Sequence, residues 1–369
     1  MKKKVLIYAL RMTVGGVEKA LLGQLTQFPK EEYDVTIVFQ NKVGKYLDFI
    51  PDYVKVEEHN EWKKVHDLVQ CPLHQNIFKA LKKGDIFQSI YLFGLYLMTK
   101  IQKSYKPLHD YVQTLISDYP GEYDLAIDYP GPTSFSANFV AKHVNAKEKW
   151  TWIHFDIDKF PIDKKVVAYV YKYFDRINIV SAEGKKRFER AFPHLADRTH
   201  VFYNIIDKTF ILSQADIIPN PYKDILAKIV ICTVGRISSE KGQLITISSL
   251  KSLLNKGYDI HWCYVGDGVD MQKCKDLANE YGIIDHVTFA GLQTNPYPWM
   301  KYCNMYIQPS VYEGYCITLA EAKLFSIPIV STNFTGAFEQ LEKYEPAHAI
   351  VECNALKIAE GIESIIQAL

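Results

Sequence analysis

Short runs of hydrophobic residues alternate along this chain with longer segments of helical period. The first example places an apolar run at residues 4–9, a glycine-containing loop at 11–16, a helical pattern at 17–28 and a second apolar run at 34–39. Apolar runs of four to eight residues bounded by turn residues are typical of buried strands. Strands that alternate with helices favour a parallel sheet. The pattern therefore predicts a βαβ unit at the start of the chain.

The same alternation continues in two series. The first predicts strands at residues 124–128, 150–155, 177–181 and 200–203. The second predicts strands at residues 229–234, 261–265, 287–290, 305–308 and 327–331. Between them, residues 204–221 gather Asn, Asp and two prolines, and 369 residues exceed what one hydrophobic core usually organises. We therefore expect an α/β protein with an N-terminal domain at residues 1–205 and a C-terminal domain at residues 206–369.

Residues 59–116 depart from this alternation and predict a helical insertion rich in lysine and aromatic residues. Within it, residues 86–99 are apolar on nearly every face, and lysines flank them on both sides. Fourteen residues are fewer than the ~20 that a membrane span needs. Two interpretations remain: a buried helix, which we favour, and a membrane-surface or acceptor-binding helix with snorkelling lysines.

Composition narrows the class of protein. A chain that is 48% hydrophobic and 23% charged is neither disordered nor fibrous. The seven scattered cysteines lack metal-ligand spacing and indicate reduced thiols in a cytosolic protein, and the start MKKKVLIYAL does not fit a signal peptide. Residues 1–200 carry 30 Lys and Arg against 24 Asp and Glu, whereas the remainder carries 13 against 18. A basic N-terminal half suits an anionic partner surface, and we expect no nucleic-acid partner.

Two segments of the C-terminal half carry candidate chemistry. In IVICTVGRISSEKGQ a buried strand turns at Gly235 into a helix, so that Arg236 and Lys241 would form a cationic cradle for a diphosphate at a helix start. Alone, this pattern would be better described as a basic helix start that faces solvent.

The second segment, MYIQPSVYEGYCITLAEAKLFSIPIVST, predicts a strand, a loop, a helix and another strand. Glu313 lies on the loop and Glu321 about two turns inside the helix, so both carboxylates can face one site. Free backbone N–H groups at the helix start would suit a phosphate or a sugar. These groups belong to Gly314, Tyr315, Cys316 and Ile317.

Together these segments resemble the large retaining B-type glycosyltransferase family that contains sucrose, glycogen and phosphatidylinositol-mannoside-type synthases and many bacterial polysaccharide-assembly enzymes. The resemblance rests on G-R-x-x-x-E-K-G at 235–242, V-G-D-G at 265–268, F-A-G at 289–291 and E-G-x(6)-E-A at 313–322. The N-terminal half matches more loosely, at Gly15-Gly16 and His154, and the insertion at 59–116 matches nothing in the family pattern.

The resemblance implies roles for individual residues. Arg236 and Lys241 would hold the donor diphosphate, Glu321 the ribose hydroxyls and Glu313 the hydroxyls of the transferred sugar. His154 would contact the donor sugar near the reacting carbon. The implied catalytic set is His154, Arg236, Lys241 and Glu313, and the implied donor-binding set is Gly15, Gly16, Gly235, Arg236, Lys241, Gly266, Gly314, Tyr315, Cys316, Ile317 and Glu321.

The resemblance also implies a fold and a reaction. Two Rossmann-like domains would face a cleft, and a terminal helix at residues 355–369 would cross back toward the N-terminal domain, unless it is short or the chain is truncated. A hexosyl group would pass with retention from a nucleotide sugar, with UDP favoured over GDP, to a glycan or a lipid-linked acceptor. No metal and no cofactor beyond the donor is expected. The wording of the C-terminal motifs suits bacterial capsule, exopolysaccharide or cell-wall synthesis by a cytoplasmic protein, peripheral on the inner membrane face.

Four alternatives stay open. Asp156 and Asp158 have the Asp-x-Asp spacing of metal-dependent A-type glycosyltransferases, although we favour two solvent-facing aspartates. The Gly266 and Gly268 pair has the spacing of a dinucleotide site, but Asp270 and Met271 disagree with that fingerprint. A nucleotide-sugar epimerase would share the fold, and the two-glutamate motif with the basic insertion favours transfer over epimerisation. A scaffold subunit without activity is disfavoured because both basic and both acidic motif residues are present.

Overall fold

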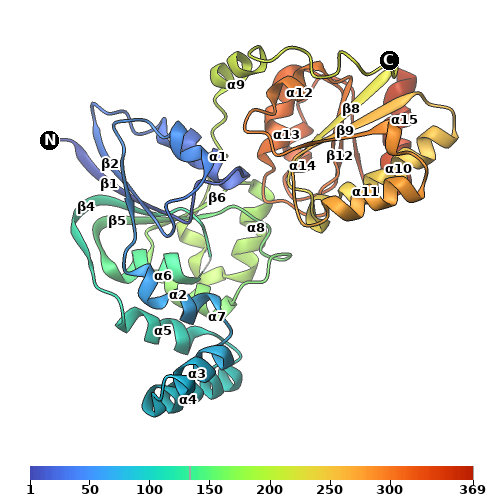
Figure 1. Cartoon of the computed structure of the whole chain (residues 1–369). Coiled ribbons are helices and arrows are strands. Elements are labelled where there is room, and N and C mark those ends of the chain that lie inside the picture. The colour runs from blue at the N-terminus through green and yellow to red at the C-terminus, as the bar shows by residue number, and fades with distance from the viewer. Residues whose placement is uncertain (133, 369) are drawn as a thin grey trace. The chain divides into compact units, whose positions relative to one another are not determined.

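The computed structural model describes residues 1–132 and 134–368, which form two compact units, each built on a parallel sheet (Figure 1). Unit 1 comprises Met1–Thr13, Gln24–Val180 and Lys185–Phe202. Unit 2 comprises Val14–Gly23, Ser181–Gly184 and Tyr203–Leu369. The expected α/β class is confirmed. The boundary expected between residues 205 and 206 stays a prediction.

Unit 1 contains a seven-stranded sheet in the order β3-β2-β1-β4-β5-β6-β7, with every pair parallel. Its strands are β1 (Lys3–Ala9), β2 (Tyr33–Phe39), β3 (Lys55–Glu58), β4 (Tyr119–Asp128), β5 (Val144–Ile153), β6 (Arg176–Ile179) and β7 (Thr199–Val201). The apolar runs expected at residues 4–9 and 34–39 form the neighbouring strands β1 and β2, and their apolar residues are buried. β3 was not predicted, because its sequence KVEE lacks an apolar run and lies at the sheet edge.

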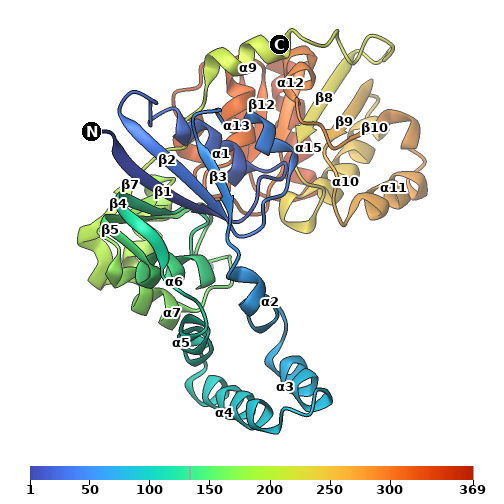
Figure 2. The same ribbon diagram turned by 60° about the vertical axis from the view of Figure 1, so that its left-hand side comes forward.

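Helices connect the strands of this sheet, and a group of them follows β3. They are α1 (Gly16–Leu25), α2 (Trp62–Gln70), α3 (Leu73–Lys82), α4 (Ile86–Gln102), α5 (Lys106–Thr114), α6 (Ser134–His143), α7 (Lys164–Val170) and α8 (Ala182–Ala191). α2 and α5 lie against the body of the unit, while α3 and α4 form a hairpin that projects from it (Figure 2). The insertion expected at 59–116 therefore consists of four helices. No helix within the described residues combines the length and the apolarity that crossing a bilayer requires.

The favoured interpretation of residues 86–99 as a buried helix is wrong. These residues do form a helix, α4, but only one narrow stripe of it is buried: Ser89, Leu92, Leu95 and Thr99. Phe87 is 89% exposed and Ile101 is 82% exposed. Because the hairpin projects from the unit, α4 packs mainly along the side that meets α3 and α5, and Lys165 of α7 reaches only its last residue, Gln102, within the described residues. The remaining apolar faces have no protein to pack against in the described part of the chain.

Unit 2 contains a six-stranded parallel sheet in the order β10-β9-β8-β11-β12-β13. Its strands are β8 (Ile229–Val234), β9 (Ile260–Val265), β10 (Val287–Gly291), β11 (Met305–Gln308), β12 (Ile329–Thr332) and β13 (His348–Val351). Its helices are α9 (Lys208–Ala215), α10 (Gln243–Asn255), α11 (Met271–Glu280), α12 (Tyr297–Tyr302), α13 (Ile317–Ala322), α14 (Ala337–Leu341) and α15 (Ala355–Ala368). β13 was not predicted, because four residues at a sheet edge give too short a pattern.

The core of unit 2 lies on both faces of its sheet. On one face, Ile358, Ile362 and Ile365 of α15 pack with Leu250 of α10 and with the buried side chains of β8 and β9. On the other face, α12, α13 and α14 contribute the buried residues. All seven cysteines of the chain are free thiols. The unit therefore presents the loops after β8, β9 and β11 at one edge of a rigid sheet, since the carboxyl ends of parallel strands share an edge.

Candidate functional site

The loops that follow β8, β9 and β11 lie in close backbone contact. This contact explains why two motif positions are glycine. Gly266 has φ 150°, and a Cβ atom there would lie 2.0 Å from the carbonyl oxygen of Gly235. Gly242 has φ 75°, and a Cβ atom there would lie 2.0 Å from the carbonyl oxygen of Pro309. Backbones this close admit no side chain. The glycines of the two motifs thus bring the loops after β8, β9 and β11 together in unit 2.

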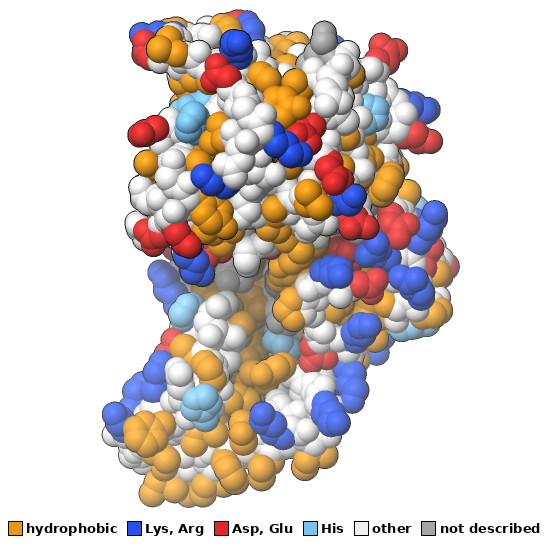
Figure 3. Space-filling view, turned by 90° about the vertical axis from the view of Figure 1, so that its right-hand side faces the viewer, with side chains coloured by type: hydrophobic (Ala, Val, Ile, Leu, Met, Phe, Trp, Pro, Cys, Tyr) orange, Lys and Arg blue, Asp and Glu red, His pale blue; other side chains and the backbone are white. Residues whose placement is uncertain are grey.

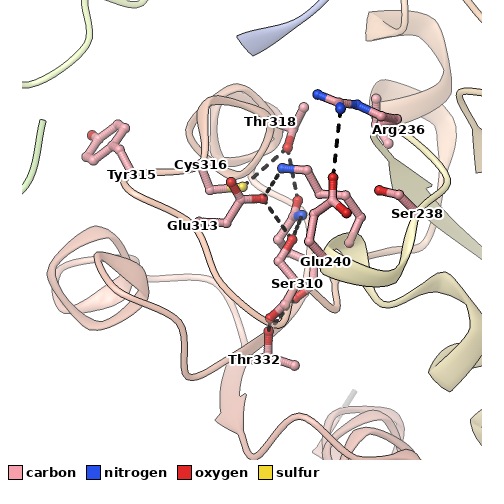
Figure 4. Close-up of polar contacts among 12 residues, drawn as sticks. Arg236, Ser238, Glu240, Ser310, Glu313, Tyr315, Cys316, Thr318 and Thr332 are labelled. Atoms are coloured by element: carbon pink, nitrogen blue, oxygen red, sulfur yellow. Dashed lines mark hydrogen bonds and ion pairs between the residues drawn. The ribbon is translucent and has the colours of Figure 1, made fainter. Parts of the chain in front are cut away.

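A lysine–glutamate pair stands at the centre of these loops (Figure 4). Lys241 Nζ lies 2.5 Å from Glu313 Oε1, and the two side chains are 23% and 12% exposed. Burial opposes the charged ammonium, but the nearby Glu313 carboxylate outweighs it, so the pKa of Lys241 lies above its ordinary value. Lys241 therefore carries a full positive charge at neutral pH in a site that is largely shielded from water.

A series of hydrogen-bonded polar side chains holds Glu313 in place. Ser310 Oγ donates to Glu313 Oε1 at 2.8 Å and accepts from Gln308 Nε2 at 2.9 Å. Gln308 Oε1 in turn accepts from Thr318 Oγ1 at 3.0 Å. Thr332 Oγ1 donates to the carbonyl of Ser310 at 2.5 Å. These bonds link the end of β11, the end of β12 and the start of α13, and they fix the direction in which Glu313 points.

The start of α13 is an unusual turn. Cys316 caps this helix in the left-handed region with φ 71°, a conformation that costs a non-glycine residue about 1 kcal/mol. Gln340 Nε2 from α14 donates to the carbonyls of Tyr315 and Cys316 and holds the turn in place. Burial raises the pKa of the Cys316 thiol, so this cysteine is a neutral packing residue. The first amides of α13 have no helical acceptor, as in any helix.

Glu321 lies deeper in α13 and is 2% exposed. Its two carboxylate oxygens accept from Lys19 Nζ at 2.7 and 2.9 Å, and Oε1 also accepts from the Tyr297 hydroxyl at 2.9 Å. Lys19 lies in Val14–Gly23, the part of α1 that groups with unit 2, and its ammonium sits 4.8 Å from the centre of the Tyr297 ring. A buried carboxylate needs such a partner, because an unpaired buried charge is strongly destabilising.

Lys19 was missed by the sequence prediction. It stands three residues after Gly16 in the segment GGVEKA, and it is separated from Glu321 by about 300 residues. No local spacing reveals such a pair. The only available signal was a lysine one turn inside the first helix, immediately after the two candidate glycines. Ser310 was also missed, although its place two residues after β11 puts it at the sheet edge where the site lies.

Arg236 behaves differently from Lys241. Its side chain is 68% exposed and makes only a 3.8 Å contact with Glu240 Oε1. It stands two residues past the end of β8 and close to the Lys241 and Glu313 pair in the loop cluster (Figure 4). An exposed guanidinium held by one long ion pair is available to an incoming anion.

Gly15 and Gly16 have ordinary backbone conformations. A Cβ atom on Gly16 would meet the Ile317 side chain at 3.9 Å, an ordinary contact, and one on Gly15 would meet only the movable Glu18 carboxylate. Gly16 thus lies beside the first residue of α13. The donor-binding role that the resemblance implies for Gly15 and Gly16 stays a prediction.

His154 lies in unit 1, just after β5, whereas the other three implied catalytic residues lie in unit 2. Its Nε2 bonds to the carbonyl of Tyr129 at 2.8 Å, and its ring packs 4.8 Å from the Tyr129 ring. Burial lowers the pKa of His154 to about 4, although the Tyr129 bond works in the opposite direction. The imidazole is therefore neutral at neutral pH, with Nε2 as the donor.

The favoured description of Asp156 and Asp158 as two solvent-facing aspartates is wrong for Asp156. Asp156 is 2% exposed and pairs with Arg187 of α8 at 2.6 Å, and its Oδ1 accepts from the backbone amide of Asp158. Asp158 is partly exposed and lies 3.3 Å from Arg190. The sequence prediction failed because both arginines lie about 30 residues downstream, where spacing gave no sign of them.

Comparison with known proteins finds a family that matches the C-terminal part of the chain. Residues 217–368 match the family described as glycosyl transferases group 1. An uncharacterized glycosyltransferase of Methanocaldococcus jannaschii is 32% identical over 199 residues, which are 53% of this chain and 46% of the relative. The N-acetylgalactosamine-N,N'-diacetylbacillosaminyl-diphospho-undecaprenol 4-alpha-N-acetylgalactosaminyltransferase of Campylobacter jejuni is 24% identical over 208 residues, covering 56% of this chain and 54% of the relative. The chain thus matches about half the length of these relatives.

The whole chain also resembles solved structures. Anabaena HepE in complex with UDP and glucose superposes with a TM-score of 0.69 at 17% identity, covering 99% of this chain and 90% of HepE. At this identity the likeness shows the fold. Residues 217–368 therefore resemble the family described as glycosyl transferases group 1, and the chain has the two-domain B-type glycosyltransferase fold.

Proposed function

We propose that this protein transfers a hexosyl group from a nucleotide sugar to a glycan or lipid-linked acceptor, with retention of anomeric configuration and without a metal ion. The observation that carries the proposal is the shielded Lys241 and Glu313 pair beside the exposed Arg236, within a glycosyl transferases group 1 domain. UDP is the proposed nucleotide, supported by its presence in the HepE complex. No cofactor beyond the donor is proposed.

The chemistry follows from where charge develops. Breaking the anomeric C–O bond builds positive charge on the sugar and negative charge on the departing nucleotide diphosphate. Two cations beside the diphosphate lower the barrier: Lys241 is held in place by Glu313 before the reaction begins and is shielded from water, and the exposed Arg236 closes on the anion. In this proposal Lys241 and Arg236 stabilise the leaving diphosphate. The acceptor hydroxyl attacks from the face that the diphosphate leaves.

The two glutamates bind hydroxyl groups of the donor. Both bonds that Glu313 accepts fall on Oε1, so its Oε2 is placed to accept a hydroxyl of the transferred sugar. Glu321 accepts three bonds, and a carboxylate offers about four acceptor sites, which leaves room for one ribose hydroxyl. In the proposal, the uncharged imidazole of His154 is a polar group near the donor sugar.

The acceptor and the location belong to the same proposal. The Campylobacter relative is named for a diphospho-undecaprenol acceptor, which supports a membrane-held acceptor and a role in bacterial capsule or cell-wall polysaccharide synthesis. The protein would then act at the cytoplasmic face of the membrane as a peripheral protein.

A donor screen by calorimetry tests this function. UDP, GDP and their common hexose conjugates are titrated with and without EDTA into the wild-type protein and Glu321→Ala, and slow donor hydrolysis is followed in parallel. We expect one nucleotide sugar to bind without metal, and its affinity to fall in the variant. Binding that requires Mn²⁺ and disappears in Asp156→Asn would overturn metal-independent transfer, and release of an epimerised nucleotide sugar would replace transfer by epimerisation.

A further inference from the structure

The α3–α4 hairpin of unit 1 exposes a continuous apolar face. Along α4, one stripe of exposed residues recurs every three or four positions, and a second stripe runs beside it. The first stripe is Ile86, Ile90, Phe93, Leu97 and Ile101, and the second contains Phe87, Tyr91 and Met98. α3 adds Phe78 and Leu81, which are 59% and 51% exposed. The lower end of Figure 3 shows these hydrophobic side chains gathered along the hairpin. Scattered exposed apolar residues are normal, but a contiguous face marks an interaction site.

The charges around this face have one sign. Residues 72–103 contain five lysines and one acidic residue, Asp85. Asp85 is used locally, because its side chain caps the start of α4 by accepting from the amide of Gln88. Lys79 pairs with Asp67 of α2. The other four lysines stand in two groups, Lys82 and Lys83 before α4, and Lys100 and Lys103 at its end.

The lysines are placed as an interfacial helix needs them. Lys82 Nζ lies 5.0 Å from the Phe78 ring, and Lys100 Nζ lies 5.5 Å from the Tyr96 ring, so their apolar stems run along aromatic surface. Such side chains bury the stem and keep the ammonium in water or among headgroups. A helix of 17 residues is about 25 Å long. Lying flat, α4 would place its apolar stripes in the acyl boundary and a lysine group at each end.

We propose that the α3–α4 hairpin docks on the surface of an anionic phospholipid bilayer, with the exposed stripes of α4 inserted at the level of the headgroups. A second copy of the chain fits less well, because four lysines with no acidic partner in the hairpin would meet the same four lysines in the other copy. Anionic lipid satisfies the apolar face and the charges together. The assignment rests on the proposed function only for its membrane-held acceptor.

Vesicle sedimentation tests the hairpin without donor or acceptor, so its failure is distinct from a failure of glycosyl transfer. Sucrose-loaded vesicles of phosphatidylcholine with about one third phosphatidylglycerol are compared with pure phosphatidylcholine vesicles. The apolar variant combines Phe87→Ser, Ile90→Ser and Ile101→Ser. Its matched control removes three exposed apolar residues of unit 2, by Ile217→Ser, Leu226→Ser and Leu356→Ser. Unchanged circular dichroism and thermal transitions show that each variant is folded.

We expect the wild type and the control to partition onto anionic vesicles and the apolar variant to partition on the order of 100-fold less, because three side chains lose their burial in lipid. Replacing Lys82, Lys83, Lys100 and Lys103 by Gln weakens binding and removes its salt dependence, whereas Gln at Lys30, Lys223, Lys228 and Lys343 changes little. Equal binding by the apolar variant overturns the proposal. So does absence of wild-type binding at low salt, or a dimer in solution that the apolar variant abolishes.

A depth probe distinguishes insertion from loose charge attraction. Residues 72–103 contain no tryptophan, so Phe87→Trp reports from the hairpin and Leu226→Trp from an equally exposed place in unit 2. Vesicles with lipids brominated on the acyl chain should quench the added emission of Phe87→Trp and leave that of Leu226→Trp unchanged. Equal quenching of both, or quenching of neither with protein bound, overturns insertion by this helix.

Discussion

Two motif carboxylates of unit 2 and one strand-end carboxyl of unit 1 lie in contrasting surroundings, although unit 1 also contains a buried ion pair, Asp156 with Arg187. In unit 2, the two motif glutamates each pair with a lysine: Glu313 with Lys241, and Glu321 with Lys19. In unit 1, Asp128 ends β4 fully buried, and its Oδ2 accepts from the Thr151 hydroxyl. Burial raises the pKa of Asp128 to about 7, and burial lowers the pKa of His154 to about 4. The folded state of unit 1 favours the neutral form of both residues.

The difference shows what each unit can offer a ligand. A lysine that is already paired with a carboxylate in a shielded site suits the binding of an anion. The anion replaces existing charge contacts, so binding does not require a new charge to be removed from water. Neutral groups offer hydrogen bonds and shape. Nucleotide diphosphate binding therefore belongs with unit 2 in the proposed function, and unit 1 carries the neutral groups and the exposed hairpin.

The strongest test of this contrast removes the unit 2 cation. Lys241→Met should lower kcat/KM of transfer at least about 1000-fold, since it removes a preorganised charge and leaves Glu313 without its cation. Lys241→Arg should recover part of the loss. Transfer is measured by release of the nucleotide diphosphate at low donor concentration.

Lys256→Met is the matched control, because Lys256 also pairs with a glutamate, Glu363, but at the surface of unit 2. It should leave transfer within about twofold of wild type, since surface pairs contribute little. If Lys241→Met keeps most of the activity, the diphosphate is stabilised elsewhere and the contrast between the units loses its functional meaning.

Much of unit 2 was predictable because the candidate site residues stand in short sequence motifs next to strands. The strands β8 and β11 were predicted at their observed bounds, and Arg236, Lys241, Glu313 and Glu321 stand in short motifs directly after those strands or inside the next helix. The structure brings Lys241 and Glu313 into contact across 72 residues. That contact was not predicted; the resemblance to the glycosyltransferase family implied only that both residues serve one donor.

What could not be predicted depends on partners far away in sequence. Periodicity showed that residues 86–99 are helical and apolar, but whether such a helix is buried depends on what packs against it, and here it packs mainly against α3 and α5 along one side. Asp156 was expected in solvent until Arg187 of α8 was seen to reach it. Lys19 and Glu321 form the same kind of long-range pair.

The second test exploits the buried carboxyl of unit 1. The pKa of Asp128 is about 7 in the folded protein and about 4 in an unfolded chain, so the folded state binds the proton more tightly between these values. Unfolding free energy contributed by this group therefore falls as pH rises through that window, by about 3 kcal/mol between pH 5 and pH 8. Asp128→Asn, which cannot ionise, should remove this fall.

The measurement is urea unfolding of wild type and Asp128→Asn across that pH range, and the quantity of interest is their difference. Subtraction cancels the opposite contribution of His154, whose lowered pKa makes stability fall as pH drops from about 6.5 toward 4. Asp118→Asn, at a side chain that is 84% exposed, should show no such difference. A difference that does not change with pH would mean that Asp128 ionises freely when folded.

A third test concerns the pair that the sequence did not reveal. Glu321→Gln and Lys19→Met should each weaken binding of the nucleotide sugar roughly 10- to 50-fold, and the double variant should lose less than the product of the two, because the residues act as a unit. Calorimetry with donor supplies the affinities. Independent, multiplicative losses would mean that Lys19 serves the ligand without acting through Glu321.

The prediction with the smallest effect compares the cost of a left-handed residue at a helix end in the two units. Lys103 ends α4 in unit 1 with φ 47°, and Ser326 ends the short helix after α13 in unit 2 with φ 53°. Glycine adopts this conformation without steric cost, although it loses more entropy on folding, so Lys103→Gly and Ser326→Gly should each stabilise by about 0.5 kcal/mol. Ser252→Gly, inside α10, should instead destabilise by a similar amount, since the helix interior favours serine over glycine. Urea unfolding that resolves all three signs would show that the units obey the same backbone rules and differ in their charges. A destabilising Ser326→Gly would instead show that this turn is held by contacts of the serine itself.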